Sequence, residues 1–185
     1  FDIFWKPNHS VESDIQILDK QFTSEFDDII KKSLNRFPIF HFKNKEFLQW
    51  RYMNHPTRNY QVLTLRNNSK LIGYIILREM NIFSKKLGII VDFVIDPNYK
   101  QRKIFQKLIK STLINFWNNN VSIAIATSKI GTLENEILRK SGFMTAPSFL
   151  KQEQLPLIIS TFNNNFKYFQ NFDDWYFALG DYDVF

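Results

Sequence analysis

The sequence has no cysteine among its 185 residues, which excludes a disulfide framework, thiol nucleophiles and cysteine-ligated metals. This absence fits a cytoplasmic protein. No apolar run approaches the roughly 20 residues that span a bilayer, and no signal peptide is recognisable. The three histidines, His9, His41 and His55, show no metal-ligand spacing, so we expect no metal. Neither an internal repeat nor a linker divides the chain, and we therefore expect a single domain over 1–185.

Hydrophobic residues make up 44% of the chain, which excludes a wholly disordered protein. Twenty-four Lys and Arg residues against eighteen Asp and Glu residues give a formal net charge of +6. The simpler interpretation is a mildly basic soluble surface, and the sharper one is an anionic ligand such as a nucleotide-like cofactor or a nucleic acid. Nucleic-acid binding rests on this charge alone, without a recognisable motif, so we rank it last and expect no nucleic-acid partner.

The middle of the chain has the pattern of a buried strand, a tight turn and an amphipathic helix. The strand, expected over 87–95, is apolar and interrupted only by Asp92. An Asp-Pro-Asn turn at 96–98 stops it, because proline cannot donate to a sheet and Asx residues favour turns. The next helix, expected over 99–117, repeats apolar residues at helical spacing. A turn that feeds a helix N-terminus points free amide groups outward, and such a site favours anions, phosphates especially.

The remaining elements follow from equally local signals. Capping residues, Asn44 among them, mark helix starts, an Asn-Asn-Ser turn marks a hairpin, and short apolar runs mark strands. Their order predicts a mixed α/β sheet with at least one crossover connection. We assign N-terminal helices and a lid to 1–56, a core to 60–145 and C-terminal strands to 146–185. The expected helices cover 13–22, 24–34, 45–54 and 132–140, and the expected strands cover 60–66, 71–78, 121–126, 143–150 and 174–179.

Four short stretches, taken in order, carry a resemblance to a known family. They are Leu-Ile-Gly-Tyr at 71–74, the strand at 89–96, the turn and helix start at 99–105, and Gly-Phe at 142–143. Together they resemble the GNAT (Gcn5-related N-acetyltransferase) superfamily. The resemblance implies an α/β (α+β) fold with a mostly antiparallel twisted sheet, flanked by helices and with a splayed central strand pair. It also implies an N-acyltransferase that moves an acetyl or short acyl group from acetyl-CoA or another acyl-CoA to a small-molecule amine.

A narrower resemblance covers more of the chain. Its residues are Glu-Phe-Leu-Gln-Trp-Arg-Tyr at 46–52, His-Pro at 55–56, Tyr60, Trp175 and Gly-Asp-Tyr-Asp at 180–183. They look like those of GNAT-like proteins encoded among bacterial surface-polysaccharide genes, some of which contain two GNAT-like halves. A chain that begins at a residue other than Met would suit the second half. The resemblance implies a nucleotide- or lipid-linked amino sugar as acceptor, and either a homodimer or a partner GNAT-like half.

Trp50, Arg51, Tyr52 and His55, expected on one short helix, are the candidate substrate-binding residues. Aromatic faces with polar tips suit a sugar-binding lip. Packing of Trp50 and Tyr52 in the core is the alternative, and we favour it over the lip.

Asp92 is the candidate general base. It is the only charge within the central apolar strand, and buried carboxylates are rare unless paired or functional. If it faces the cleft, burial raises its pKa and suits it to deprotonating an amine. The alternative is a position at a sheet edge or a pair with a neighbouring arginine. Asp181 and Asp183 are further residues of interest through the narrower resemblance, although a solvated acidic terminus is the default interpretation.

The family pattern also places cofactor groups on this sequence. Val94 and Ile95 would offer backbone groups to the acyl carbonyl where the strand bulges. Ser128, directly after the next expected strand, would place a hydroxyl beside the thioester or the leaving thiolate. The loop that would bind the acyl-CoA pyrophosphate consists of Lys100, Gln101, Arg102, Lys103, Ile104 and Phe105.

Four positions depart from the family pattern. Lys103 and Phe105 stand where the phosphate loop has small residues that let the backbone approach the pyrophosphate. Leu138 falls at the register of the tyrosine that protonates the leaving thiolate, and Gly131 falls at that of an asparagine, with Asn135 one turn further on. These departures favour the alternative function, a non-catalytic GNAT-like module that binds or supports a partner domain.

Overall fold

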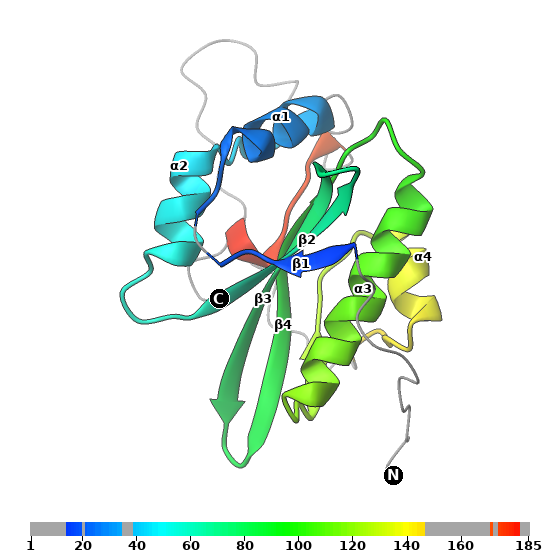
Figure 1. Ribbon diagram of the computed structural model, residues 1–185. Helices are drawn as coiled ribbons and strands as arrows, with labels where there is room; N and C mark the ends of the chain where they lie inside the picture. Colours follow the sequence, from blue (N-terminus) through cyan, green and yellow to red (C-terminus); the bar gives the residue numbers. More distant parts are fainter. Residues whose placement is uncertain (1–13, 20, 35–38, 147–170, 172–173, 182–185) are drawn as a thin grey trace.

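A computed structural model describes residues 14–19, 21–34, 39–146, 171 and 174–181. Five strands form one sheet in the order β1-β2-β3-β4-β5 (Figure 1). Neighbouring strands are antiparallel except β4 and β5, which are parallel and joined by a crossover helix. The strands are β1 (Ile15–Ile17), β2 (Tyr60–Asn67), β3 (Lys70–Ile82), β4 (Lys85–Ile95) and β5 (Ile123–Ile125).

Helices cover both faces of the sheet (Figure 1). One face carries α1 (Ser24–Ser33) and α2 (Lys45–Leu48), and α2 continues into a π-helical turn, Gln49–Met53. The other carries the crossover helix α3 (Gln101–Asn118) and α4 (Leu133–Lys140). Each face has its own apolar cluster. One cluster lies between the sheet and the helices α1 and α2, and the other lies between the sheet and the helices α3 and α4. This mixed, mostly antiparallel sheet with flanking helices confirms the expected fold class.

Local sequence explains most of the helices. Phe26, Ile29 and Ile30 of α1 recur at helical spacing and are all buried. The Asn44 side chain accepts a hydrogen bond from the Phe47 N–H (3.0 Å) and so caps α2, as expected. Gly142 follows α4 with a φ of +96°, a conformation that glycine adopts without strain. Among the described residues, no helix combines the length and apolar character needed to cross a membrane.

Three expectations about elements are wrong in the described residues. A helix was expected over 13–22, but 15–17 form the edge strand β1, because their backbone pairs with β2 at Leu63–Leu65. Residues 143–146 form no strand, while 147–150 lie outside the described residues. The last expected strand, 174–179, is reduced to a single bridge between Ile39 and Trp175 and is followed by a 3₁₀ turn, Leu179–Asp181.

A β-bulge in β4 sets the direction of its side chains. Asp92 pairs with Ile76 of β3, and Ile90 pairs with the next residue, Leu77, so that Val91 has no partner in the register. Ile90 packs on the α3 side and Val91 on the α1 side. The extra residue interrupts the alternation of faces. Asp92 therefore follows Val91 on the α1 side, where its ionic partner lies.

Candidate functional site

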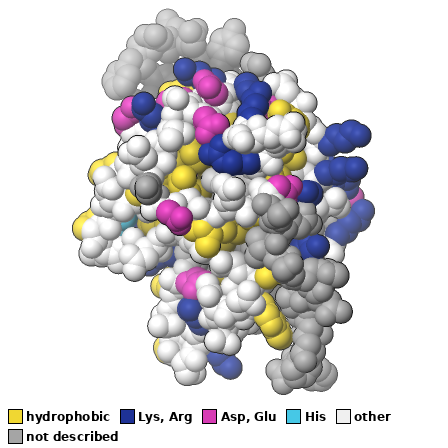
Figure 2. Space-filling model, in the orientation of Figure 1, with side chains coloured by type: hydrophobic (Ala, Val, Ile, Leu, Met, Phe, Trp, Pro, Cys, Tyr) yellow, Lys and Arg dark blue, Asp and Glu magenta, His cyan; other side chains and the backbone are white. Residues whose placement is uncertain are grey.

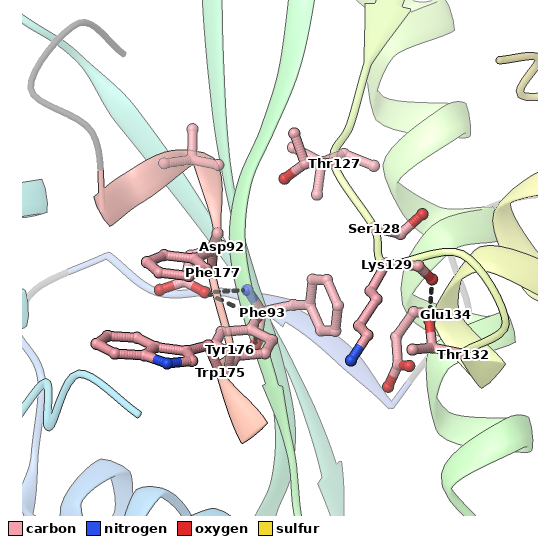
Figure 3. A pocket seen from close by; sticks show the side chains of 13 residues that line it. Asp92, Phe93, Thr127, Ser128, Lys129, Thr132, Glu134, Trp175, Tyr176 and Phe177 are labelled. Atoms are coloured by element: carbon pink, nitrogen blue, oxygen red, sulfur yellow. Dashed lines mark hydrogen bonds between the residues drawn. The ribbon is translucent and has the colours of Figure 1, made fainter. Parts of the chain in front are cut away.

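The sheet opens between β4 and β5. The two strands pair only through Leu87–Ile89 and Ile123–Ile125, and β4 continues beyond this pairing to Ile95. A cavity forms in the opening (Figure 3). Its walls come from β4, from the chain after β5, from the start of α4 and from the end of the described chain. The lining residues are 90–93, 127–129, Thr132, Glu134 and 175–178.

The C-terminal segment, residues 174–181, forms one wall of this cavity. Its backbone is tied to Ile39, whose N–H donates to the Asp174 carbonyl (2.9 Å) and whose carbonyl accepts from the Tyr176 N–H (3.0 Å). The Tyr176 hydroxyl lies 3.1 Å from the Phe93 carbonyl oxygen and 3.3 Å from Asp92 Oδ1. The remaining cavity has a volume of about 50 Å³, whereas small-molecule pockets commonly measure about 300–1,000 Å³. The described residues thus leave only a small space in the opening.

Asp92 lies in the wall of the cavity and is 1% exposed. Its Oδ2 accepts a hydrogen bond from Lys43 Nζ (2.6 Å), and its Oδ1 accepts one from the Phe93 N–H (2.8 Å). Burial raises the pKa of Asp92, and the nearby Asp181 carboxylate adds to this effect while Lys43 opposes it. Asp92 thus lines the opening, and its ionic partner is a lysine, not the neighbouring arginine of the alternative.

Lys43 connects Asp92 to a second carboxylate. Its ammonium lies 2.7 Å from Asp181 Oδ1, and the lysine is itself 1% exposed. Burial lowers the pKa of Lys43, but the attraction of the two carboxylates outweighs burial and raises it above the ordinary lysine value. His41 Nδ1 lies 3.3 Å from the same Asp181 oxygen. We call Lys43, Asp92, Asp181 and His41 the Lys43 cluster.

Sequence reasoning identified Asp92 and noted Asp181 but missed Lys43. A buried carboxylate within an apolar strand requires a partner, and the chain offers 24 Lys and Arg residues. Lys43 precedes the capping residue of a short helix, and no pattern in the neighbouring sequence indicates that its side chain is buried. No signal in the sequence would have selected it.

The start of α3 divides the expected phosphate loop into buried and exposed parts. Ile104 and Phe105 are buried, and Phe105 packs against Phe93 with ring centroids 4.6 Å apart. Lys100 and Lys103 are exposed. Arg102 makes two hydrogen bonds to the Glu136 carboxylate of α4, at 2.9 and 2.8 Å. Lys and Arg side chains gather on the side of the molecule where α3 lies (Figure 2). The loop thus presents lysines at a helix start, while its last two side chains belong to the core.

The other residues expected to contact the acyl group lie in β4 and in the chain after β5. Val94 and Ile95 pair regularly with Tyr74 and Gly73 of β3, and the bulge of β4 lies earlier in the strand, at Val91. Ser128 lines the cavity, and its Oγ accepts a hydrogen bond from Asn135 Nδ2 (3.1 Å).

The four candidate substrate residues do not share one surface. Tyr52 and Arg51 are buried, whereas Trp50 is 62% exposed, so the expectation of core packing is confirmed for Tyr52 and wrong for Trp50. His55 is half-buried and lies beyond the end of the π-helical turn. The Tyr52 hydroxyl lies directly against Gly180, where an added Cβ would collide with it.

Comparisons with known proteins identify the fold. No protein-family model and no curated protein matches the sequence. Solved structures do match. An aminoglycoside acetyltransferase from an uncultured soil metagenomic sample, in complex with trehalose, has a TM-score of 0.53 and 18% identity, covering 83% of this chain and 100% of that chain. A probable acetyltransferase has a TM-score of 0.59 and 15% identity (78% and 99% covered). Glucosamine-6-phosphate N-acetyltransferase from Arabidopsis thaliana has a TM-score of 0.54 and 14% identity, covering 79% of this chain and 99% of that chain. The chain has the fold of the GNAT acetyltransferases.

The described residues contain no group of three His, Asp or Glu side chains arranged to hold a metal ion. The polar side chains around the cavity are two carboxylates, Asp92 and Glu134, several hydroxyls and the ammonium group of Lys129. Such groups can move protons and bind anions, which is the chemistry that direct acyl transfer to an amine requires.

Proposed function

We propose that the chain is an N-acyltransferase that moves an acetyl or short acyl group from acyl-CoA to an amine. The observation that carries the proposal is the position of Asp92, a buried carboxylate that a β-bulge directs to the opening between β4 and β5. The fold supports it, since structures of similar fold include acetyltransferases of aminoglycosides and of glucosamine-6-phosphate. One such aminoglycoside N-acetyltransferase was solved in complex with CoA.

The proposed reaction is a direct attack without a covalent enzyme intermediate. The acceptor nitrogen forms a bond to the thioester carbonyl carbon, and the bond from that carbon to sulfur breaks. Asp92 takes the proton that the amine loses, and its raised pKa suits this role. Backbone groups of β4 polarise the carbonyl. Ser128, whose hydroxyl lines the cavity, is the proposed donor near the leaving thiolate.

The start of α3 is the proposed site for the CoA phosphates. The first N–H groups of a helix lack partners within the helix and attract anions. Exposed Lys100 and Lys103 flank this end, and Gln101 begins the helix. Arg102 is already engaged by Glu136, so we assign the phosphates to the two lysines and the backbone.

An amino sugar, as in a surface polysaccharide, is the proposed acceptor. Trp50, Phe47 and His41 form an aromatic row. The ring centroids of exposed Trp50 and Phe47 are 5.8 Å apart, and those of Phe47 and His41 are 4.8 Å apart. His41 contacts Asp181, so the row leads from the surface toward the Lys43 cluster. Aromatic faces beside a carboxylate suit a sugar that carries an amine.

A second candidate function has its own support. Asp92 already accepts hydrogen bonds from Lys43 and the Phe93 N–H, and the cavity beside it is small. A non-catalytic GNAT-like module that binds or supports a partner domain would show this closed arrangement.

Thermal unfolding with and without acetyl-CoA separates the two candidates. A ligand added well above its Kd stabilises the folded state by a few kcal/mol, so the enzyme should show a clear rise in Tm. Transfer of labelled acetyl groups to amino sugars should accompany it. Asp92→Asn should keep the Tm rise and lower turnover. The absence of any Tm change at millimolar acetyl-CoA would exclude the acyltransferase and leave the binding module.

A further inference from the structure

A buried base must release the proton that it accepts before it can act again. Asp92 has no exposed side-chain surface. Its carboxylate is contacted by the Phe93 N–H, by Lys43 Nζ and by the Tyr176 hydroxyl. The amide proton is fixed, and Tyr176 lies in the cavity wall, so a proton passed to its hydroxyl stays beside the reacting groups. Lys43 is the contact that leads away from the cavity.

An unbroken series of polar contacts runs from Asp92 to the surface through the Lys43 cluster. The ammonium of Lys43 lies 2.6 Å from Asp92 Oδ2 and 2.7 Å from Asp181 Oδ1. The same Asp181 oxygen lies 3.3 Å from His41 Nδ1. Side-chain exposure rises along the series, from 0% at Asp92 to 1% at Lys43, 10% at Asp181 and 51% at His41. Each group can donate or accept a proton, and the last one meets solvent.

We propose that Lys43, Asp181 and His41 carry the proton from Asp92 to solvent after each acyl transfer. This inference rests on the proposed function, because the transferred amine supplies the proton. Asp92 is then the residue that touches the acceptor, and the other three groups act through it.

The proton count closes over one cycle. Asp92, protonated by the amine, gives a proton to Lys43 as Lys43 gives one of its own three to Asp181. Asp181 passes that proton to the neutral His41 imidazole, which releases a proton to water. Lys43 remains an ammonium, and both carboxylates are ionised again. Histidine suits the exit position because its imidazole has two ring nitrogens, so one can accept a proton while the other releases one to water.

The path can be tested without any acyl transfer, by measuring how fast the Lys43 ammonium protons exchange with water. ¹⁵N-detected NMR of the labelled protein resolves ammonium groups held in ion pairs. A buried lysine without a path exchanges only when the structure opens. In the wild type, His41 should catalyse exchange of the Lys43 protons, and His41→Phe should slow it by about tenfold or more. His55→Phe is the control, since this half-buried histidine lies against Tyr60 and outside the Lys43 cluster, and it should leave the rate unchanged.

Turnover provides the second measurement. His41→Ala should lower the rate of acetyl transfer, and imidazole added to the buffer should restore it, while the KM for acetyl-CoA stays the same. A residue that only supported the fold would not be replaced by free imidazole. Equal exchange rates of Lys43 in the wild type and His41→Phe, or a turnover loss that imidazole leaves unchanged, would overturn the path. A wild type that transfers no acetyl group but shows His41-dependent exchange would overturn the proposed function and keep the path.

Discussion

Replacing Lys43 with methionine keeps a side chain of similar length but removes the only charge that balances Asp92 within the described residues around it. The carboxylate of Asp92 has no exposed surface, and Asp181 is 10% exposed. Removing one partner of a buried ion pair costs about 3–5 kcal/mol, because the remaining charge stays buried without compensation. Domains of this size are stable by about 5–15 kcal/mol, so Lys43→Met should lose a large fraction of the free energy of unfolding.

Urea denaturation followed by circular dichroism measures this loss. The double variant Lys43→Met/Asp92→Asn is the control, because neutralising Asp92 removes the uncompensated charge. It should be more stable than Lys43→Met alone, and the difference measures the cost of leaving the Asp92 carboxylate buried without its partner; the single variant Asp92→Asn completes the cycle that gives the interaction energy of the pair.

The stability loss caused by Lys43→Met should also depend on pH, in a direction set by the pKa of Asp92. In Lys43→Met, burial still raises the pKa of Asp92 above its unfolded value of 3.8, now without the opposing lysine. The folded state then binds the proton more tightly than the unfolded chain, so stability is full below that value and falls as pH rises through the folded-state pKa. The deficit of Lys43→Met should shrink as the pH is lowered toward 4. A loss below about 1 kcal/mol, or a deficit that grows on acidification, would refute the assignment of a buried ion pair.

Three further predictions concern other parts of the structure. Gly180→Ala should lower the Tm, because its Cβ meets the Tyr52 hydroxyl, and Tyr52→Phe should recover part of that loss in the double variant. The pKa of Glu136 is lowered to about 2, chiefly by its hydrogen bonds from Arg102, so its contribution to stability is present above the ordinary glutamate pKa and lost as pH falls toward 2. Glu136→Gln should therefore differ from the wild type near neutral pH and match it in strong acid, as followed by chemical denaturation. Trp50→Ala should leave the Tm unchanged and weaken amino-sugar binding measured by calorimetry, whereas a Tm loss would place Trp50 in the core.

The elements that the sequence predicts well are those defined by local chemistry. Asn44 caps its helix through a hydrogen bond to a residue three positions away. The central strand is visible because it is apolar, and α3 because its apolar residues repeat at helical spacing. The edge strand β1 is different: it has three residues, and only its pairing with β2 makes it a strand. A partner 48 residues away leaves no trace in so short a segment.

The site shows the same limit more strongly. Asp92 could be singled out because a charge in an apolar strand is conspicuous by itself. The bulge at Val91 could not be placed, because it is a property of the register between β3 and β4. Phe105 stands at a position that is small in the family pattern, and its contact with Phe93 shows that its side chain serves the core. Residues whose role depends on a distant partner, Lys43 above all, require the folded structure.

The contacts of the Lys43 cluster join parts of the chain that are synthesised at very different times. Lys43 and Asp92 are 49 residues apart, Tyr176 and Asp92 are 84 apart, and His41 and Asp181 are 140 apart. Contacts of such high sequence separation form late in folding, and on the ribosome Asp181 emerges long after the sheet strands. Until then Lys43 lacks its second carboxylate, Asp92 lacks the Tyr176 hydroxyl, and the cavity wall formed by residues 174–181 is missing. The segment 174–181, which is translated after all five strands, therefore completes the site, so removal of this segment should keep the sheet and remove the Asp181 and Tyr176 contacts.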